Sequence, residues 1–166
     1  GQPARAEAAV WRIGWMNMAF TLAVSVVFFF LHDKLVALFT DDAQVIAGQG
    51  SVGLEIAAQA AALGLREGAV ITCCGGGGLA SGIALALEAE APGLRLHTAE
   101  PEGFDDMARS LASGTIQRND RLTGSICDAI LTPQPGDLTF PILHRLAGPG
   151  QVVTDDQALH AMALAF

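Results

Sequence analysis

The chain has 166 residues, of which 51% are hydrophobic and only 16% are charged, and its formal net charge is −8. This charge excludes binding to a nucleic-acid backbone, because no cluster of Lys and Arg is present to neutralise phosphates. The three cysteines, Cys73, Cys74 and Cys127, show no CxxC spacing and no Cys/His cluster. They therefore exclude a zinc site and favour free thiols in a reducing compartment.

Residues 13–31 form an apolar run without a charged residue. Its length is close to the roughly 20 residues that a helix needs to span a bilayer. A buried core helix is the alternative, but residues 26–30 are apolar all round and leave no polar face for water. We therefore expect a transmembrane-like helix, through which residues 13–31 contact a membrane.

Strand and helix patterns alternate from Ala47 onward. The pattern predicts a first helix that Ser51 caps and Gly64 ends, and a last helix that opens with a Thr154/Gln157 capping box. Strands separated by helices indicate βαβ units, so the predicted fold class is α/β with a parallel sheet flanked by helices. The expected elements are helix 51–64, strand 68–74, helix 79–91, strand 94–100, helix 104–114, helix 139–148, strand 151–153 and a helix from 154.

Four consecutive glycines, at 75–78, lie between the strand at 68–74 and the next helix. In a parallel α/β sheet, ligands bind beyond the carboxyl ends of the strands. Glycines let backbone N–H groups face a ligand, and the helix N-terminus adds unpaired donors and partial positive charge. An ordinary turn rarely needs four glycines, since each costs up to about 1 kcal/mol relative to alanine. The turn therefore predicts a phosphate site that needs no lysine or arginine.

The spacing leaves the kind of phosphate open. Gly75, Gly77 and Ala80 satisfy the dinucleotide fingerprint G-x-G-x-x-A, and Glu100 stands where an acid would bind the ribose. A dinucleotide-binding oxidoreductase is therefore one candidate. A P-loop is excluded, because no GK[ST] sequence follows the glycines.

Five segments resemble, in order, the serine/threonine dehydratases, which are pyridoxal-phosphate enzymes of the tryptophan-synthase-β type: AGQGSVGLEI, CCGGGGLASGIALAL, AEPEGFDDMARSL, SICDAILTPQPGDLTFPIL and VVTDDQALHAM. The resemblance covers residues 45–166. It implies part of a fold type II domain and a cytoplasmic homo-oligomer that converts serine or threonine to a 2-oxo acid and ammonia. It also implies that the cofactor phosphate is held by Gly75, Gly76, Gly77, Gly78 and the amide of Leu79.

The same resemblance implies a divalent cation, Mg²⁺ or Mn²⁺, bound by Glu100, Asp106 and the carbonyl of Phe104. Two carboxylates and a carbonyl suit a hard cation. The residues alone support a simpler interpretation as well. Asp105 and Asp106 open a helix, where acidic side chains interact favourably with the dipole.

A pyridoxal-phosphate lyase also needs a lysine that binds the cofactor as a Schiff base and moves the α-proton. Lys34 is the only lysine, and its LHDKL context does not match the lysine motif of the family. We therefore assign no catalytic residue. We expect the chain to be a fragment of an ammonia-lyase without turnover of its own.

Residues 1–42 differ from the rest of the sequence. The segments GQPARAEAAVWR and LHDKLVALFTDD, with the apolar run between them, resemble a late segment of multidrug and toxic-compound extrusion transporters. We expect two parts, a hydrophobic helical segment at 1–42 and a partial pyridoxal-phosphate-binding domain at 43–166. The two resemblances meet at FTDDAQVIAGQG, which favours a chimera. A transporter fragment with a fused soluble tail is the alternative.

Overall fold

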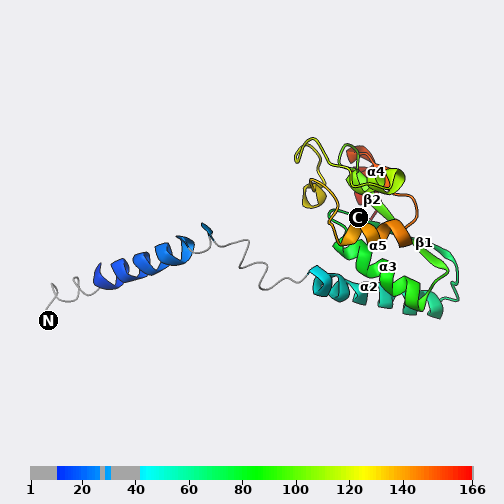
Figure 1. The fold of residues 1–166 in the computed structure, drawn as a ribbon, viewed down its shortest axis with the longest axis horizontal. Coiled ribbons are helices and arrows are strands. Elements are labelled where there is room, and N and C mark those ends of the chain that lie inside the picture. Colours follow the sequence, from blue (N-terminus) through cyan, green and yellow to red (C-terminus); the bar gives the residue numbers. More distant parts are fainter. Residues whose placement is uncertain (1–10, 27–28, 31–41, 166) are drawn as a thin grey trace. The chain divides into compact units, whose positions relative to one another are not determined.

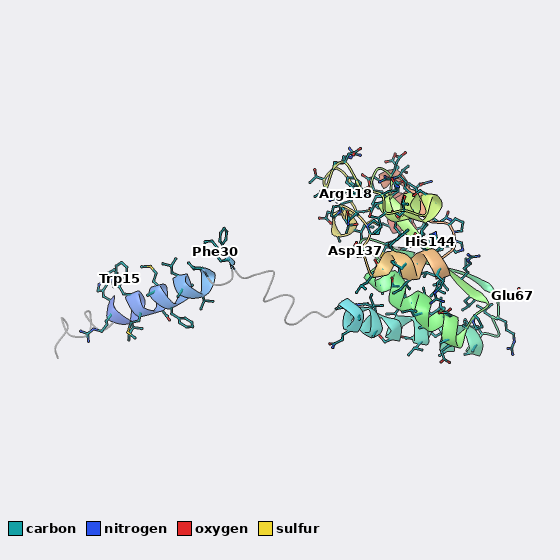
Figure 2. The ribbon with its side chains drawn as sticks, in the orientation of Figure 1. Trp15, Phe30, Glu67, Arg118, Asp137 and His144 are labelled. Atoms are coloured by element: carbon teal, nitrogen blue, oxygen red, sulfur yellow. The ribbon has the colours of Figure 1, made fainter. Side chains whose placement is uncertain are left out.

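The computed structural model describes residues 11–26, 29–30 and 42–165, and the chain divides into the compact units Gly1–Asp41 and Asp42–Phe166 (Figure 1). In the first unit, residues 11–26 and 29–30 are helical, and side chains such as Trp15 and Phe30 are exposed (Figure 2).

The membrane helix predicted at 13–31 falls partly outside the described residues, because 27, 28 and 31 are not among them. Within the part of the chain that the structure describes, no helix has both the length and the apolar character needed to cross a bilayer. The structure therefore does not support the predicted membrane span.

The second unit has an α/β fold, as predicted. Its three strands are all parallel and follow the order β1-β2-β3, so β2 is central. The elements are α2 (Asp42–Ala62), β1 (Gly68–Cys73), α3 (Gly78–Glu90), β2 (Leu94–Pro101), α4 (Asp106–Ser113), the 3₁₀ helix η1 (Asp128–Ile130), α5 (Thr139–Leu146), β3 (Gln151–Val153) and α6 (Asp155–Ala165).

The two faces of the sheet differ in burial. Leu94 and Leu96 on β2 lie in one hydrophobic cluster with Ile83 and Leu87 of α3. On the other face, Ile71 of β1 is 63% exposed. Because side chains alternate along a strand, this asymmetry determines which face of the sheet packs against α3. The core therefore lies between the sheet and α3.

Helices α2 and α3 lie side by side (Figure 1) and approach each other backbone to backbone. A Cβ atom built on Gly82 of α3 would lie 2.5 Å from the carbonyl oxygen of Ile46 and 2.6 Å from the nitrogen of Gly50. A Cβ on Gly53 would lie 2.7 Å from that of Ala86. Glycines in AGQGSVGLEI and LASGIALAL therefore allow the close helix crossing.

The predicted N-cap at Ser51 is wrong, because α2 begins nine residues earlier, at Asp42. Ser51 lies inside the helix, where its hydroxyl donates a hydrogen bond of 2.9 Å to the carbonyl of Gly48. The apolar pattern continues upstream of Ser51, and Ile46 is buried. Burial of Ile46 against the rest of the unit extends the helix past the residue that local capping preferences favour.

Three other predicted helix ends are confirmed, at Gly64, at Gly114 and at the Thr154/Gln157 capping box. Gly64 follows α2 and Gly114 follows α4, each with φ of +73°, the left-handed conformation typical of a helix C-terminus. At the start of α6, the amide of Thr154 donates to Oε1 of Gln157 at 2.9 Å. The amide of Gln157 donates to the Thr154 hydroxyl at 3.2 Å. This is the reciprocal pairing of a capping box.

Candidate functional site

The glycine turn connects the carboxyl end of β1 to α3. Strand pairing continues one residue past β1, since the amide of Cys74 donates to the carbonyl of Ala99 at 3.0 Å. Gly77 then takes φ of +93°, a left-handed conformation that favours glycine, and α3 begins at Gly78. The turn therefore lies at the strand-to-helix junction that the sequence predicts.

The four glycines alternate between tight and open surroundings. A Cβ on Gly75 would lie 3.1 Å from Cγ2 of Thr132, and one on Gly77 would lie 2.8 Å from Cε of Met107. A Cβ on Gly76 or Gly78 would meet no heavy atom within 4 Å. Two glycines thus permit close packing behind the turn, and the other two leave open space beside it.

A cavity of about 300 Å³ lies against Gly76 and Gly78. Its other walls come from Val45 and Ile46 at the start of α2 and from residues 136–139 at the start of α5. Asp137, labelled in Figure 2, lies in the loop that precedes α5. The glycine turn therefore faces a recess large enough for a small ligand group.

The N-terminus of α3 has backbone donors to offer. Its N-cap is Gly77, which has no side chain that could cap the helix amides, and the first turn contains no acidic residue. The amide of Ser81 bonds to the carbonyl of Gly77 at 2.8 Å. The amides that precede Ser81 lie ahead of the helical ladder and have no intrahelical acceptor. Uncapped amides, the positive end of the dipole and an open recess fit a phosphate group.

The two cysteines before the glycines lie in different environments. Cys74 is buried, and this burial raises the pKa of its thiol well above the ordinary value, with smaller contributions from Glu100 and Asp106. Cys73 is exposed, and all three cysteines are free. The thiol of Cys74 therefore stays protonated beneath the turn, as expected for a structural residue and not for a ligand.

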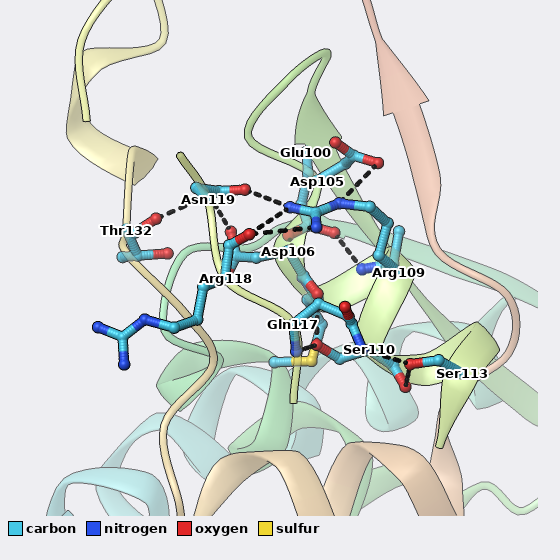
Figure 3. A network of polar contacts seen from close by, with 12 residues as sticks. Glu100, Asp105, Asp106, Arg109, Ser110, Ser113, Gln117, Arg118, Asn119 and Thr132 are labelled. Atoms are coloured by element: carbon cyan, nitrogen blue, oxygen red, sulfur yellow. Dashed lines mark hydrogen bonds and ion pairs between the residues drawn. The ribbon is translucent and has the colours of Figure 1, made fainter. Parts of the chain in front are cut away.

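Glu100, the second-last residue of β2, caps α4 (Figure 3). Its side chain is fully buried, and its Oε1 and Oε2 accept hydrogen bonds from the amides of Met107 at 2.8 Å and Ala108 at 2.7 Å. These amides belong to the first turn of α4, which has no side-chain bond from its N-cap, Asp105. A residue that sequence spacing could place on a ribose therefore stabilises a helix N-terminus instead.

Asp106 lies beside Glu100 in a buried polar network (Figure 3). Its Oδ1 accepts a hydrogen bond of 2.6 Å from Nδ2 of Asn119, which also donates to the carbonyl of Thr132 at 2.8 Å. Arg109 donates to Oδ1 of the same asparagine. The other carboxylate oxygen, Oδ2 of Asp106, is buried and has no hydrogen-bond partner. Asn119 therefore connects α4 to the loop that carries Thr132.

Burial sets the charge of both carboxyl groups. It raises the pKa of Glu100 from 4.5 to about 8, an effect that the two amide bonds oppose and that Asp106 and Asp105 reinforce. It also raises the pKa of Asp106, against the hydrogen bond from Asn119. At neutral pH the Glu100–Asp106 pair therefore favours a bound proton, and a positively charged group beside it would favour the ionised form instead.

The metal site predicted from Glu100, Phe104 and Asp106 comes together only in part. Glu100 and Asp106 are close enough for the charge of Asp106 to raise the pKa of Glu100, and Phe104 is fully buried with Arg121 5.1 Å above its ring. Among the described residues, no group of three or more His, Cys, Asp or Glu side chains could hold a metal. Of the three predicted ligands, only the carboxylates of Glu100 and Asp106 are thus shown to lie close together.

Sequence reasoning missed three residues that shape the site. Thr139 binds the glycine turn from α5, Met107 packs against Gly77, and Asn119 links Asp106 to Thr132. Each acts across a long sequence separation, and no local motif marks these contacts. Lys34, the only lysine of the chain, lies outside the described residues.

Comparison with known proteins identifies the class that this fold and glycine turn define. The family model described as "Pyridoxal-phosphate dependent enzyme" matches residues 32–166, so the chain belongs to this family. The match begins inside the segment that resembles a transporter. We therefore reject a dinucleotide site at the glycine turn. The chain belongs to the pyridoxal-phosphate family, and both carboxylate oxygens of Glu100 accept hydrogen bonds from amides of α4.

Two curated relatives, a serine racemase and a threonine dehydratase, are similar to most of the chain. A serine racemase of Dictyostelium discoideum is 42% identical over 132 residues, covering 79% of this chain and 39% of the racemase. A catabolic L-threonine dehydratase of Escherichia coli (strain K12) is 37% identical over 122 residues, covering 74% of this chain and 36% of the dehydratase. The chain thus spans under two fifths of the length of these relatives.

Solved structures agree with this assignment. A threonine deaminase from T.th. matches with a TM-score of 0.69 at 40% identity, over 73% of this chain and 43% of that one. Maize serine racemase matches with a TM-score of 0.65 at 39% identity, over 72% of this chain and 36% of that one. The α/β unit described above is therefore part of the fold of these enzymes.

Proposed function

We propose that residues 43–166 form the cofactor-phosphate-binding part of a pyridoxal-phosphate-dependent serine/threonine ammonia-lyase. The observation that carries the proposal is the uncapped N-terminus of α3, which opens on a glycine turn and a recess. Pyridoxal phosphate, when bound, supplies an electron sink for chemistry at the α-carbon of an amino acid. The residues proposed to hold its phosphate are Gly75, Gly76, Gly77, Gly78 and Leu79.

Gly76, Gly77, Gly78 and Leu79 contribute to the proposed site in different ways. The open surroundings of Gly76 and Gly78 let the phosphate approach the backbone, while Gly77 supplies the left-handed turn that starts α3. Leu79 contributes its amide and packs its side chain against the core, which fixes the first turn of the helix. The phosphate is thus neutralised by backbone dipoles rather than by a side-chain cation.

The proposal does not extend to turnover by this chain. The described residues contain no lysine, so none of them can anchor the cofactor covalently or move the α-proton. We expect purified chain mixed with pyridoxal phosphate and serine to produce no pyruvate. It should also lack the visible absorption band of a lysine-bound cofactor.

A serine racemase is the second candidate, because a relative with that name is 42% identical. Elimination and racemisation both begin with loss of the α-proton, and they differ in whether the β-hydroxyl group leaves. The phosphate site serves either reaction equally. The phosphate site therefore does not distinguish serine from threonine as the substrate either.

We also propose that Glu100, Asp106 and the carbonyl of Phe104 bind a divalent cation such as Mg²⁺ or Mn²⁺. The support is the buried, unpartnered Oδ2 of Asp106 next to a second buried carboxyl group. Titration calorimetry with MgCl₂ and MnCl₂ tests this. Binding that Asp106→Asn abolishes supports the site, whereas heat that is unchanged in this variant contradicts it.

The transporter-like segment at 1–42 is proposed to be foreign to the enzyme-like unit. The boundary between the two compact units falls at Asp41, next to the expected junction. Amplification across codons 35–55 from source DNA tests the idea of an assembly artefact, which a continuous product of native length contradicts. Partition of residues 1–42 into detergent tests whether this segment contacts a membrane.

A thermal-shift comparison tests the proposed function. Pyridoxal phosphate should raise the melting temperature of the chain more than pyridoxal does, because only the former carries the phosphate. NAD⁺ should produce no shift. Equal shifts with pyridoxal and pyridoxal phosphate, or a shift with NAD⁺ alone, would overturn the proposal.

A further inference from the structure

The start of α5 is bound directly to the glycine turn. Thr139, the first residue of α5, is 8% exposed, and its hydroxyl donates a hydrogen bond to the carbonyl of Gly76. The amide of Gly136 donates to the same carbonyl oxygen at 3.1 Å. The Gly76 carbonyl therefore has two donors from a segment about 60 residues further along the chain.

A second hydrogen bond runs in the reverse direction. The hydroxyl of Ser81, a fully buried residue in the first turns of α3, donates to the carbonyl of Thr139 at 3.4 Å. The amide of Ser81 in turn donates to the carbonyl of Gly77 at 2.8 Å. The beginnings of α3 and α5 are thus held together by reciprocal bonds on both sides of Gly77.

These bonds determine where the backbone donors of the turn point. The peptide unit between Gly76 and Gly77 is planar and trans, so its C=O and N–H point in opposite directions. Holding the Gly76 carbonyl on Thr139 and Gly136 therefore directs the Gly77 amide away from α5. Free glycine residues would otherwise sample many conformations, since ordering each residue costs roughly 1–2 kcal/mol.

The side chain of Thr139 also confines the turn sterically. A Cβ on Gly77 would lie 2.9 Å from Oγ1 and 3.0 Å from Cβ of Thr139. The threonine methine and hydroxyl thus lie directly behind the glycine with the left-handed backbone. Hydrogen bonding and close packing both come from this one side chain.

We infer that Thr139 is a positioning residue for the proposed phosphate site at 75–79: its hydroxyl orders the Gly76–Gly77 peptide before the cofactor arrives. Thr139 acts through the turn and does not itself hold the phosphate. The inference rests on the proposed function and adds to it a residue outside the glycine motif. A preorganised site binds more tightly because its ordering cost is met during folding.

The test compares pyridoxal phosphate with pyridoxal on the full chain. The ratio of the dissociation constant of pyridoxal to that of pyridoxal phosphate, measured by titration calorimetry, isolates the contribution of the phosphate. Thr139→Val keeps the shape and removes the hydroxyl, so this ratio should fall by about 2- to 13-fold, the usual effect of one hydrogen bond. Thr139→Ser retains the hydroxyl and should restore most of the ratio.

A matched control is Thr98→Val on β2. Thr98 is buried like Thr139, but its hydroxyl has no hydrogen-bond partner. This variant removes a buried hydroxyl without disturbing the turn and should leave the ratio at the wild-type value. Loss in Thr139→Val, rescue in Thr139→Ser and no change in Thr98→Val together support the inference.

The experiment distinguishes failure of the proposed function from failure of the inference about Thr139. A wild-type chain that binds both compounds equally overturns the proposed function and this inference with it. A wild-type chain that prefers pyridoxal phosphate, with the same preference in folded Thr139→Val, overturns the inference alone. If circular dichroism shows that Thr139→Val does not fold, Ser81→Ala provides the test. Its ratio should fall by about 2- to 5-fold, and an unchanged ratio contradicts the role of the bonds between α3 and α5.

Discussion

Glu100 should make the unit less stable as the pH rises through neutrality. The pKa of this carboxyl is about 8 in the folded chain, against an ordinary value of 4.5. Between these values the folded state keeps a proton that the unfolded chain has lost. The stabilising contribution is therefore complete below pH 4.5 and is lost as the pH rises toward 8.

The magnitude follows from the shift. One pKa unit corresponds to about 1.4 kcal/mol, so the whole window amounts to on the order of 3–6 kcal/mol of unfolding free energy. Within the window the slope from one proton is at most about 1.4 kcal/mol per pH unit. This is a large share of the roughly 5–15 kcal/mol that stabilises an ordinary domain. Asp106, whose pKa is also raised, adds a slope of the same sign.

Urea unfolding followed by circular dichroism between about pH 5 and pH 8 measures this slope. Glu100→Gln cannot ionise and should remove the contribution of Glu100 to the slope, leaving the part that belongs to Asp106. Glu102→Gln changes an exposed carboxylate two residues away and serves as the control, with the slope of the wild type. Stability that rises across this range, or a Glu100→Gln slope equal to that of the wild type, would refute the reasoning.

Three further predictions concern packing, capping and the polar network. Gly82→Ala places a Cβ within 2.6 Å of two backbone atoms of α2 and should lower the unfolding free energy by about 1–3 kcal/mol, measured by urea unfolding. Gly48→Ala on the same helix pair meets nothing within 4 Å and should be neutral or slightly stabilising; equal losses in both would contradict the crossing geometry. Thr154→Ala removes the capping box of α6 and should cost about 1 kcal/mol, seen as faster amide exchange in α6 only. Asn119→Ala removes a hydrogen bond that lowers the pKa of Asp106, so this pKa should rise further in an NMR titration; a fall would contradict the network.

Much of the α/β unit is predictable from the sequence because its elements are marked locally. The β-rich run at 68–74 and the glycines that end α2 and α4 predict strand and helix boundaries to within a residue or two. The Thr154/Gln157 pair predicts a capping box that the structure confirms. These features depend on residues that are neighbours in sequence, where propensity and capping act.

The features that escaped prediction depend on distant partners. The start of α2 is set by burial of Ile46, which overrides the capping preference of Ser51. Glu100 stands in sequence where an acid would bind a ribose, but in the fold its carboxylate oxygens accept hydrogen bonds from two amides of α4. The bond from Thr139 to Gly76 joins segments whose proximity follows only from packing of α5 on α3. Pairing of this kind is a property of the tertiary fold.

The central claim, that the glycine turn holds the phosphate of pyridoxal phosphate, is tested most directly by amide NMR of the ¹⁵N-labelled chain. Addition of pyridoxal phosphate should shift the amide resonances of residues 75–79 before any others, and pyridoxal should leave them in place. Shifts that occur elsewhere in the unit while the resonances of 75–79 stay unchanged would contradict the account.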